Sequence, residues 1–221
     1  RIDATSGFTK GILFDNLIDN PRGLTLHRGG TLWVSALSND QVVAIDAYTG
    51  EELHRLTIPR AFAIAADADR IYVTGQAEGS VHMIDALTGD YLGVLAQNLG
   101  PNLEEMTINR AGDLLIGDSA DGILRVDAAT GAILARAPTF TPGPVAIDHD
   151  GFLISKNIDG RLVRLDPSSL TEINTIANFF PPQHGMLVYR IPEPAAILIL
   201  GVSIATTCVA TGHRRHRRVG K

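Results

Sequence analysis

The sequence predicts an all-β protein: a β-propeller of four complete four-stranded blades plus partial blades, followed by a single transmembrane helix at the C-terminus. Three observations lead to this prediction. A phrase centred on an aspartate recurs about every 40 residues, which is the size of one propeller blade. Each period contains four short strand patterns separated by turn residues. An apolar segment followed by an arginine cluster ends the chain. We therefore expect a propeller over residues 1–190 and a tail over 191–221.

The composition indicates one folded domain with a short appendage. The chain has 221 residues, of which 45% are hydrophobic, and a net charge of -5. Such a chain can bury a sizeable core. Nearly all the acidic residues precede Pro194, whereas arginines crowd the last few positions. An acidic body offers no basic surface for phosphate groups, so we expect no nucleic-acid partner.

The repeated phrase is Ile/Val-Asp-Ala-x-Thr-Gly. It occurs at residues 45–50, 84–89 and 126–131, and degenerate copies occur at 2–7 and 165–169. An aspartate carboxylate can accept hydrogen bonds from the backbone N–H groups of the following residues, and glycine supplies the positive φ that closes a tight turn. Because the phrase recurs once per unit, we interpret its aspartates as turn caps rather than catalytic groups.

Each unit carries four apolar, β-branched runs bounded by turn residues. The expected strands are 23–27, 31–37, 42–46 and 52–58; 62–66, 70–75, 81–85 and 91–96; 105–109, 113–118, 123–127 and 132–137; and 145–148, 152–156, 162–166 and 172–177. An additional strand is expected at 11–17 before these units. A first strand without a second is expected at 186–189 after them.

The partial units raise the question of ring closure. A propeller closes a ring of about four to eight blades, usually by pairing strands from both termini in one blade. The units here fit either a small, irregularly closed ring or the back part of a larger one whose first blades and signal peptide precede Arg1. We favour the truncated larger ring.

The strand patterns resemble a known group of repeats. Residues 21–26 (Pro-Arg-Gly-Leu-Thr-Leu), 30–35 (Gly-Thr-Leu-Trp-Val-Ser) and 41–46 (Gln-Val-Val-Ala-Ile-Asp) are similar to NHL and YVTN-type propeller repeats. The resemblance extends over residues 1–190. Proteins with such repeats include binding modules, lactonases and lyases, so the resemblance implies a fold without selecting one function.

The C-terminal tail carries the most specific motif. Pro192, Glu193 and Pro194 precede an apolar run at 195–211, which is followed by a basic cluster. As a helix this run would span about 25 Å, slightly less than a bilayer core of about 30 Å. The cluster would remain on the cytoplasmic side. Its arginines are Arg214, Arg215, Arg217 and Arg218.

This order of motif, apolar segment and arginines is similar to the PEP-CTERM sorting signal of exopolysaccharide-producing Gram-negative bacteria. The resemblance implies that the protein is exported and anchored transiently in the inner membrane through its C-terminal helix. An exosortase-type processing enzyme would then cleave it near Pro192–Pro194 and release it to the cell surface or the extracellular matrix. A plain tail anchor with an accidental Pro-Glu-Pro sequence is the alternative.

Candidate site residues are few. Glu104, Glu105, Asp118 and Asn157 are oxygen ligands that could form a loose calcium site, although ordinary surface acids explain them equally well. No catalytic residues are assigned, because no nucleophile elbow, phosphate loop or zinc spacing occurs. Trp33 and Tyr72 occupy equivalent places in adjacent units and are expected to pack between blades.

These patterns favour a noncatalytic, exported propeller whose loops contact an extracellular polysaccharide or a surface protein. The alternative is a lactonase-like propeller hydrolase or lyase that uses a divalent cation in its central channel. A third possibility is a spacer beneath another domain. Acids or histidines in register in three or more blades would favour the enzyme.

Overall fold

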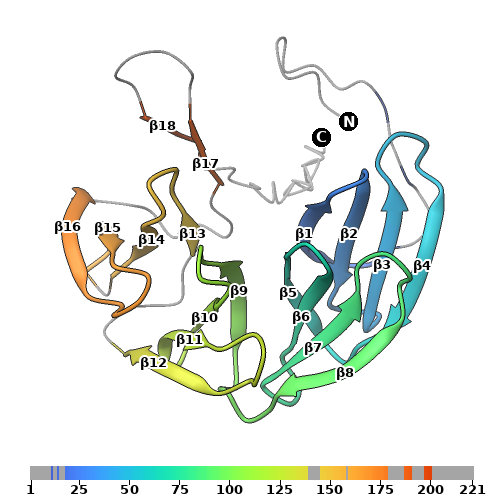
Figure 1. Cartoon of the computed structure of the whole chain (residues 1–221), viewed down its shortest axis with the longest axis horizontal. Coiled ribbons are helices and arrows are strands. Elements are labelled where there is room, and N and C mark those ends of the chain that lie inside the picture. Colours follow the sequence, from blue (N-terminus) through green and yellow to red (C-terminus); the bar gives the residue numbers. More distant parts are fainter. Residues whose placement is uncertain are drawn as a thin grey trace, which may run out of the picture.

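The structure is a computed structural model that describes residues 11, 14, 18–138, 145–157 and 159–178, together with strands β17 (Leu187–Arg190) and β18 (Ile197–Leu200). Every regular element among these residues is a strand. Four four-stranded sheets fan around a common axis (Figure 1). The predicted all-β class and its four complete units are therefore confirmed.

The four sheets follow one another along the chain, and we call them the first to fourth blades. The first blade contains β1 (Pro21–His27), β2 (Thr31–Ala36), β3 (Gln41–Asp46) and β4 (Glu52–Thr57). The second contains β5 (Ala61–Ala66), β6 (Arg70–Gly75), β7 (Ser80–Asp85) and β8 (Tyr91–Ala96). The third contains β9 (Leu103–Ile108), β10 (Leu114–Asp118), β11 (Gly122–Val126) and β12 (Ile133–Ala137). The fourth contains β13 (Ala146–Ile147), β14 (Leu153–Lys156), β15 (Leu162–Leu165) and β16 (Glu172–Ala177).

Within each blade the strands pair antiparallel in chain order. The first strands, β1, β5, β9 and β13, lie toward the centre, and the fourth strands lie at the periphery (Figure 1). The expected strands of all four units are present, with only small differences at their ends. This agreement follows from turn residues that interrupt each apolar run at a regular spacing.

Apolar side chains fill the junctions between neighbouring blades. Trp33 on β2 and Tyr72 on β6 are both almost completely buried. Trp33 packs with second-blade residues, including Ile71 and Val73, whereas Tyr72 packs with third-blade residues, including Leu114. Both side chains therefore lie between blades, as the sequence predicts. The third and fourth blades share a cluster of the same kind.

The repeated aspartates cap the turn between the third and fourth strands of each blade. Oδ1 of Asp46 accepts hydrogen bonds from the N–H groups of Tyr48 and Thr49, at 2.8 and 2.7 Å. Equivalent bonds form at Asp85, Asp127 and Asp166. The prediction that these aspartates are turn caps is confirmed.

The residue four positions after each of these aspartates has a positive φ. Gly50, Gly89 and Gly131 have φ values of 81°, 75° and 75°. In the fourth blade Leu170 takes this place at φ 58°. A left-handed non-glycine residue costs about 1–2 kcal/mol. Leu170 is 3% exposed and packs between the third and fourth blades, which offsets this cost.

The C-terminal strands form a two-stranded sheet beyond the fourth blade. Leu187 pairs with Leu200 and Arg190 with Ile197. The strand expected at 186–189 is present as β17. The expectation that no second strand follows it is wrong, because β18 pairs with β17. The same pairing places Ile197–Leu200 in a strand, whereas the sequence predicts a helix from 195 onward.

The remaining tail predictions fall outside the described residues. These include Pro192, Glu193, Pro194, the rest of the apolar run, and the arginine cluster Arg214, Arg215, Arg217 and Arg218. Within the described part, the structure contains no helix with the length and apolar character needed to span a membrane. Of the additional strand expected at 11–17, only Gly11 and Phe14 are described.

The turn glycines provide a test of the blade contacts. A Cβ on Gly131 would lie 2.1 Å from the backbone oxygen of Leu95 in the second blade. We expect Gly131→Ala to lower the free energy of unfolding by more than about 2 kcal/mol, because the φ strain and a clash with backbone add together. Gly112 also has a positive φ but faces open space, so Gly112→Ala should lose only about 1 kcal/mol. Urea unfolding followed by circular dichroism measures both variants, and equal losses would contradict the close contact.

Candidate functional site

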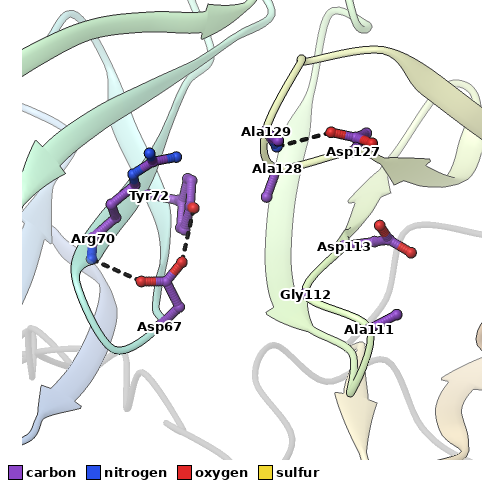
Figure 2. Close-up of a pocket in the computed structure, with 9 residues that line it drawn as sticks. All are labelled: Asp67, Arg70, Tyr72, Ala111, Gly112, Asp113, Asp127, Ala128 and Ala129. Carbon is purple, nitrogen blue, oxygen red and sulfur yellow. Dashed lines mark hydrogen bonds between the residues drawn. The ribbon is translucent and has the colours of Figure 1, made fainter.

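A cleft of about 260 Å³ lies between the second and third blades. The turns β5–β6, β9–β10 and β11–β12 form it, so it lies at one end of the blades. In Figure 2 the second-blade residues face those of the third blade across the opening. The lining residues are Asp67, Arg70, Tyr72, Ala111, Gly112, Asp113, Asp127, Ala128 and Ala129.

The second-blade wall is organised by Asp67. Its Oδ1 accepts the N–H groups of Asp69 and Arg70, at 2.8 and 2.7 Å, and its Oδ2 accepts the Tyr72 hydroxyl at 2.9 Å. Burial, aided by the hydrogen bond to Asp67, raises the pKa of Tyr72 to about 12. Tyr72 therefore remains a protonated donor that holds the Asp67 carboxylate in place.

The third-blade wall carries two further carboxylates. Asp113 accepts hydrogen bonds from Nε of Arg125 at 2.7 Å and from Nδ2 of Asn109 at 3.2 Å. Asp127 caps the β11–β12 turn, and the N–H of Thr130, followed by that of Ala129, holds the pKa of its carboxyl below the usual range. This wall therefore offers negatively charged hydrogen-bond acceptors next to small alanine and glycine residues.

The neighbouring blade junctions are bridged on the same side of the molecule. His27 Nε2 donates to the carbonyl of Ala68 at 2.9 Å across the first junction. Arg125 Nη1 donates to the carbonyl of Ser168 at 2.5 Å across the third. In the second blade, Asp67 stands at the repeat position of His27 and bonds within its own blade. Met83 stands at the position of Arg125 and packs in the core. On this side of the second junction neither of these two side chains bridges the blades, and the cleft lies there.

Two of the predicted calcium ligands, Asp118 and Asn157, accept hydrogen bonds from backbone N–H groups of turns. Asp118 is fully buried, and its oxygens accept the N–H groups of Asn102, Ala120 and Asp121 at 2.7–3.1 Å. Oδ1 of Asn157 similarly accepts the N–H groups of Asp159 and Arg161, at 3.1 and 3.0 Å. Each of these oxygen atoms therefore has a hydrogen-bond partner within the protein.

Glu104 and Glu105 lie half-buried on β9, at the end of the third blade opposite the cleft. Over the residues that the structure describes, no group of three or more His, Cys, Asp or Glu side chains could hold a metal ion. Calcium binding by Glu104, Glu105, Asp118 and Asn157 stays a prediction.

A buried polar chain in the second blade has no counterpart in the sequence-based predictions. His82 Nε2 lies 2.8 Å from Ser80 Oγ, and His82 Nδ1 lies 2.9 Å from the hydroxyl of Tyr91. Ser80 is completely buried, so a substrate has no approach to this serine–histidine pair. Burial lowers the pKa of His82, although the negative charge of Glu78 acts in the opposite direction. The alternation of Ser80 and His82 on β7 places both on one face, but only the pairing with β8 brings Tyr91 to them.

Comparison with known proteins gives distant relatives. No family model matches the chain. It is 25% identical over 198 residues to the protein YncE of Salmonella typhi and 24% identical over 197 residues to YncE of Escherichia coli O157:H7, both described as uncharacterized. Each match covers 81% of this chain but 53% of the relative, so the chain spans about half the length of the curated relatives it matches.

Among solved structures, a protein of unknown function from Bacteroides caccae matches with a TM-score of 0.55 and 14% identity, covering 71% of this chain and 60% of that one. At this identity the likeness concerns the fold alone. The chain therefore has a propeller-like fold and distant relatives among the YncE proteins.

The buried histidine predicts a pH-dependent stability. The folded-state pKa of His82 lies below the ordinary value of about 6.5, so the unfolded chain binds the proton more readily. The stabilisation from neutral His82 is complete above about pH 6.5 and decreases as the pH falls toward the folded-state pKa. We expect His82→Gln to flatten this dependence in urea unfolding between about pH 7.5 and 5.5. The same slope in His82→Gln and in the unsubstituted protein would show that His82 is not the responsible group.

Proposed function

We propose that the chain belongs to an exported β-propeller that acts as a noncatalytic binding module for extracellular polysaccharide. The cleft between the second and third blades is the observation that carries this proposal. It combines carboxylate acceptors with the guanidinium donor of Arg70, and hydroxyl groups of a sugar can pair with both. Small residues along the third-blade wall leave room for a ring to approach.

The charge of the cleft favours a neutral polymer over an anionic one. Asp67 and Asp127 line it beside a single arginine, Arg70, whereas the third carboxylate, Asp113, is already paired with Arg125. A strongly anionic polysaccharide would meet like charge here, and the whole chain carries a net charge of -5. The proposal is therefore restricted to uncharged, hydroxyl-rich chains.

The tail supports the export part of the proposal through its sequence motif. Pro192–Pro194, the apolar run and the arginine cluster would anchor the protein in the inner membrane until an exosortase-type enzyme cleaves it. Ile197–Leu200 form β18 in the structure, so the membrane-inserted helix would be a different state of these residues.

The binding proposal predicts a selective loss in cleft variants. We expect the protein to be retarded in native gels that contain a neutral polysaccharide, such as dextran or a β-glucan, but not in gels that contain hyaluronate. Combining Arg70→Gln with Asp127→Asn should weaken this retention about tenfold, through loss of charged hydrogen bonds. Asn at position 127 keeps a side-chain oxygen for the turn.

Asp85→Asn is the matched control, because Asp85 caps the equivalent turn of the second blade but does not line the cleft. It should bind like the unsubstituted protein. Absence of retention by every neutral polysaccharide, or an equal loss in Asp85→Asn, would contradict the proposal.

The export proposal predicts a shorter mature protein. Cleavage at the Pro-Glu-Pro motif would lower the intact mass of the exported protein by about 3 kDa, the mass of the residues that follow the motif. Replacing Glu193 and Pro194 by alanine should leave the full mass and keep the protein in the membrane fraction. An unprocessed protein in the medium would contradict the sorting role.

A further inference from the structure

The third residue of the aspartate-capped turn differs in size from blade to blade. Counted from the capping aspartate, this position holds Tyr48, Leu87, Ala129 and Ser168, in blade order. Of these four residues, Ala129 lines the cleft. The first blade therefore shows what a large side chain does at the position of Ala129.

In the first blade the Tyr48 ring covers the neighbouring β1–β2 turn. A Cβ on Gly30 would lie 2.5 Å from Cε2 of Tyr48 and 3.2 Å from its Cδ2, so the ring lies directly over this glycine. The equivalent glycine of the third blade is Gly112, and a Cβ there would face open space. Gly112 and Ala129 both line the cleft. The place that an aromatic ring fills in the first blade is thus open in the cleft.

The backbone around this place is the same in both blades. Gly30 and Gly112 have φ values of 88° and 91°. Each donates its N–H to the carbonyl three residues earlier, at 3.3 and 3.0 Å. The N–H groups of Tyr48 and Ala129 both donate to their capping aspartate at 2.8 Å. Because the two turns match, a tyrosine at position 129 in the rotamer of Tyr48 would place its ring over Gly112.

We infer that the space over Gly112 and Ala129, here called the ring subsite, holds one six-membered ring of the polysaccharide, and that the small side chain of Ala129 keeps it open. This inference rests on the proposed binding role. A cavity of about 150 Å³ is large enough to bind benzene. The cleft has a volume of about 260 Å³, so one ring with its hydroxyl groups fits.

The opposite wall selects a sugar ring over an aromatic one. A ring on Gly112 faces the second-blade wall, where Asp67 and Arg70 lie (Figure 2). The hydroxyl groups of a pyranose can donate to a carboxylate and accept from a guanidinium. A hydrocarbon aromatic ring would cover these charged groups without pairing with them, which costs free energy. The ring subsite is therefore suited to a ring that carries hydroxyl groups.

Substitutions taken from the chain's own repeats test the ring subsite. Ala129→Tyr introduces the residue of the first blade, whose ring should fill the subsite and lower the affinity for oligosaccharides of dextran or β-glucan by more than about tenfold. Ala129→Ser introduces the residue of the fourth blade, leaves the subsite open and should bind like the unsubstituted protein. Titrations followed by two-dimensional NMR of the backbone amides measure these affinities. In the unsubstituted protein the signals of Gly112 and Ala129 should shift on binding.

The outcomes separate this inference from the binding role itself. Saturable binding that leaves the signals of Gly112 and Ala129 unchanged would overturn the inference and leave the binding role standing. Equal affinities for Ala129→Tyr and Ala129→Ser would do the same. Absence of binding by every oligosaccharide would contradict the binding role, and the inference would fall with it. The signals of the unsubstituted protein do not depend on either variant folding.

Discussion

The fold depends on the burial of each sheet between its neighbours. A single four-stranded blade of about 40 residues has too little core to be stable alone, so each must cover the next. Trp33 and Tyr72 occupy the same repeat position, and each fills the junction between its own blade and the next blade along the chain. Because the second and third strands of each blade are mostly buried on both faces, they consist mainly of apolar residues.

Once the sheets are stacked, the turns determine what the molecule exposes. One carboxylate oxygen of each repeated aspartate fixes a turn, so these carboxylates have a structural role. They are Asp46, Asp85, Asp127 and Asp166. The cleft lies at the second junction, where Asp67 bonds to Tyr72 of its own blade, whereas His27 and Arg125 each donate across their own junctions.

Sequence reasoning predicted the strands, turn caps and blade packing, because these depend on local chemistry repeated in every unit. It named Asp118 as a calcium-ligand candidate but could not show that three backbone N–H groups donate to its carboxylate. The run Asp-Ser-Ala-Asp at 118–121 was the available signal for a turn. The His82–Tyr91 contact and the cleft depend on strand register and on the spacing of two blades, which no local pattern encodes. The apolar run at 195–211 gave no sign of the strand at Ile197–Leu200.

Native-state hydrogen exchange of the 221-residue chain tests most directly whether face-to-face burial holds the blades together. If it does, the amides of β6, β7, β10 and β11 exchange slowest, because blades cover both faces of these strands. Amides of β1 exchange faster, since Leu24 and Leu26 leave one face of this strand exposed. Equal protection in all blades, or slowest exchange in the first, would contradict the account.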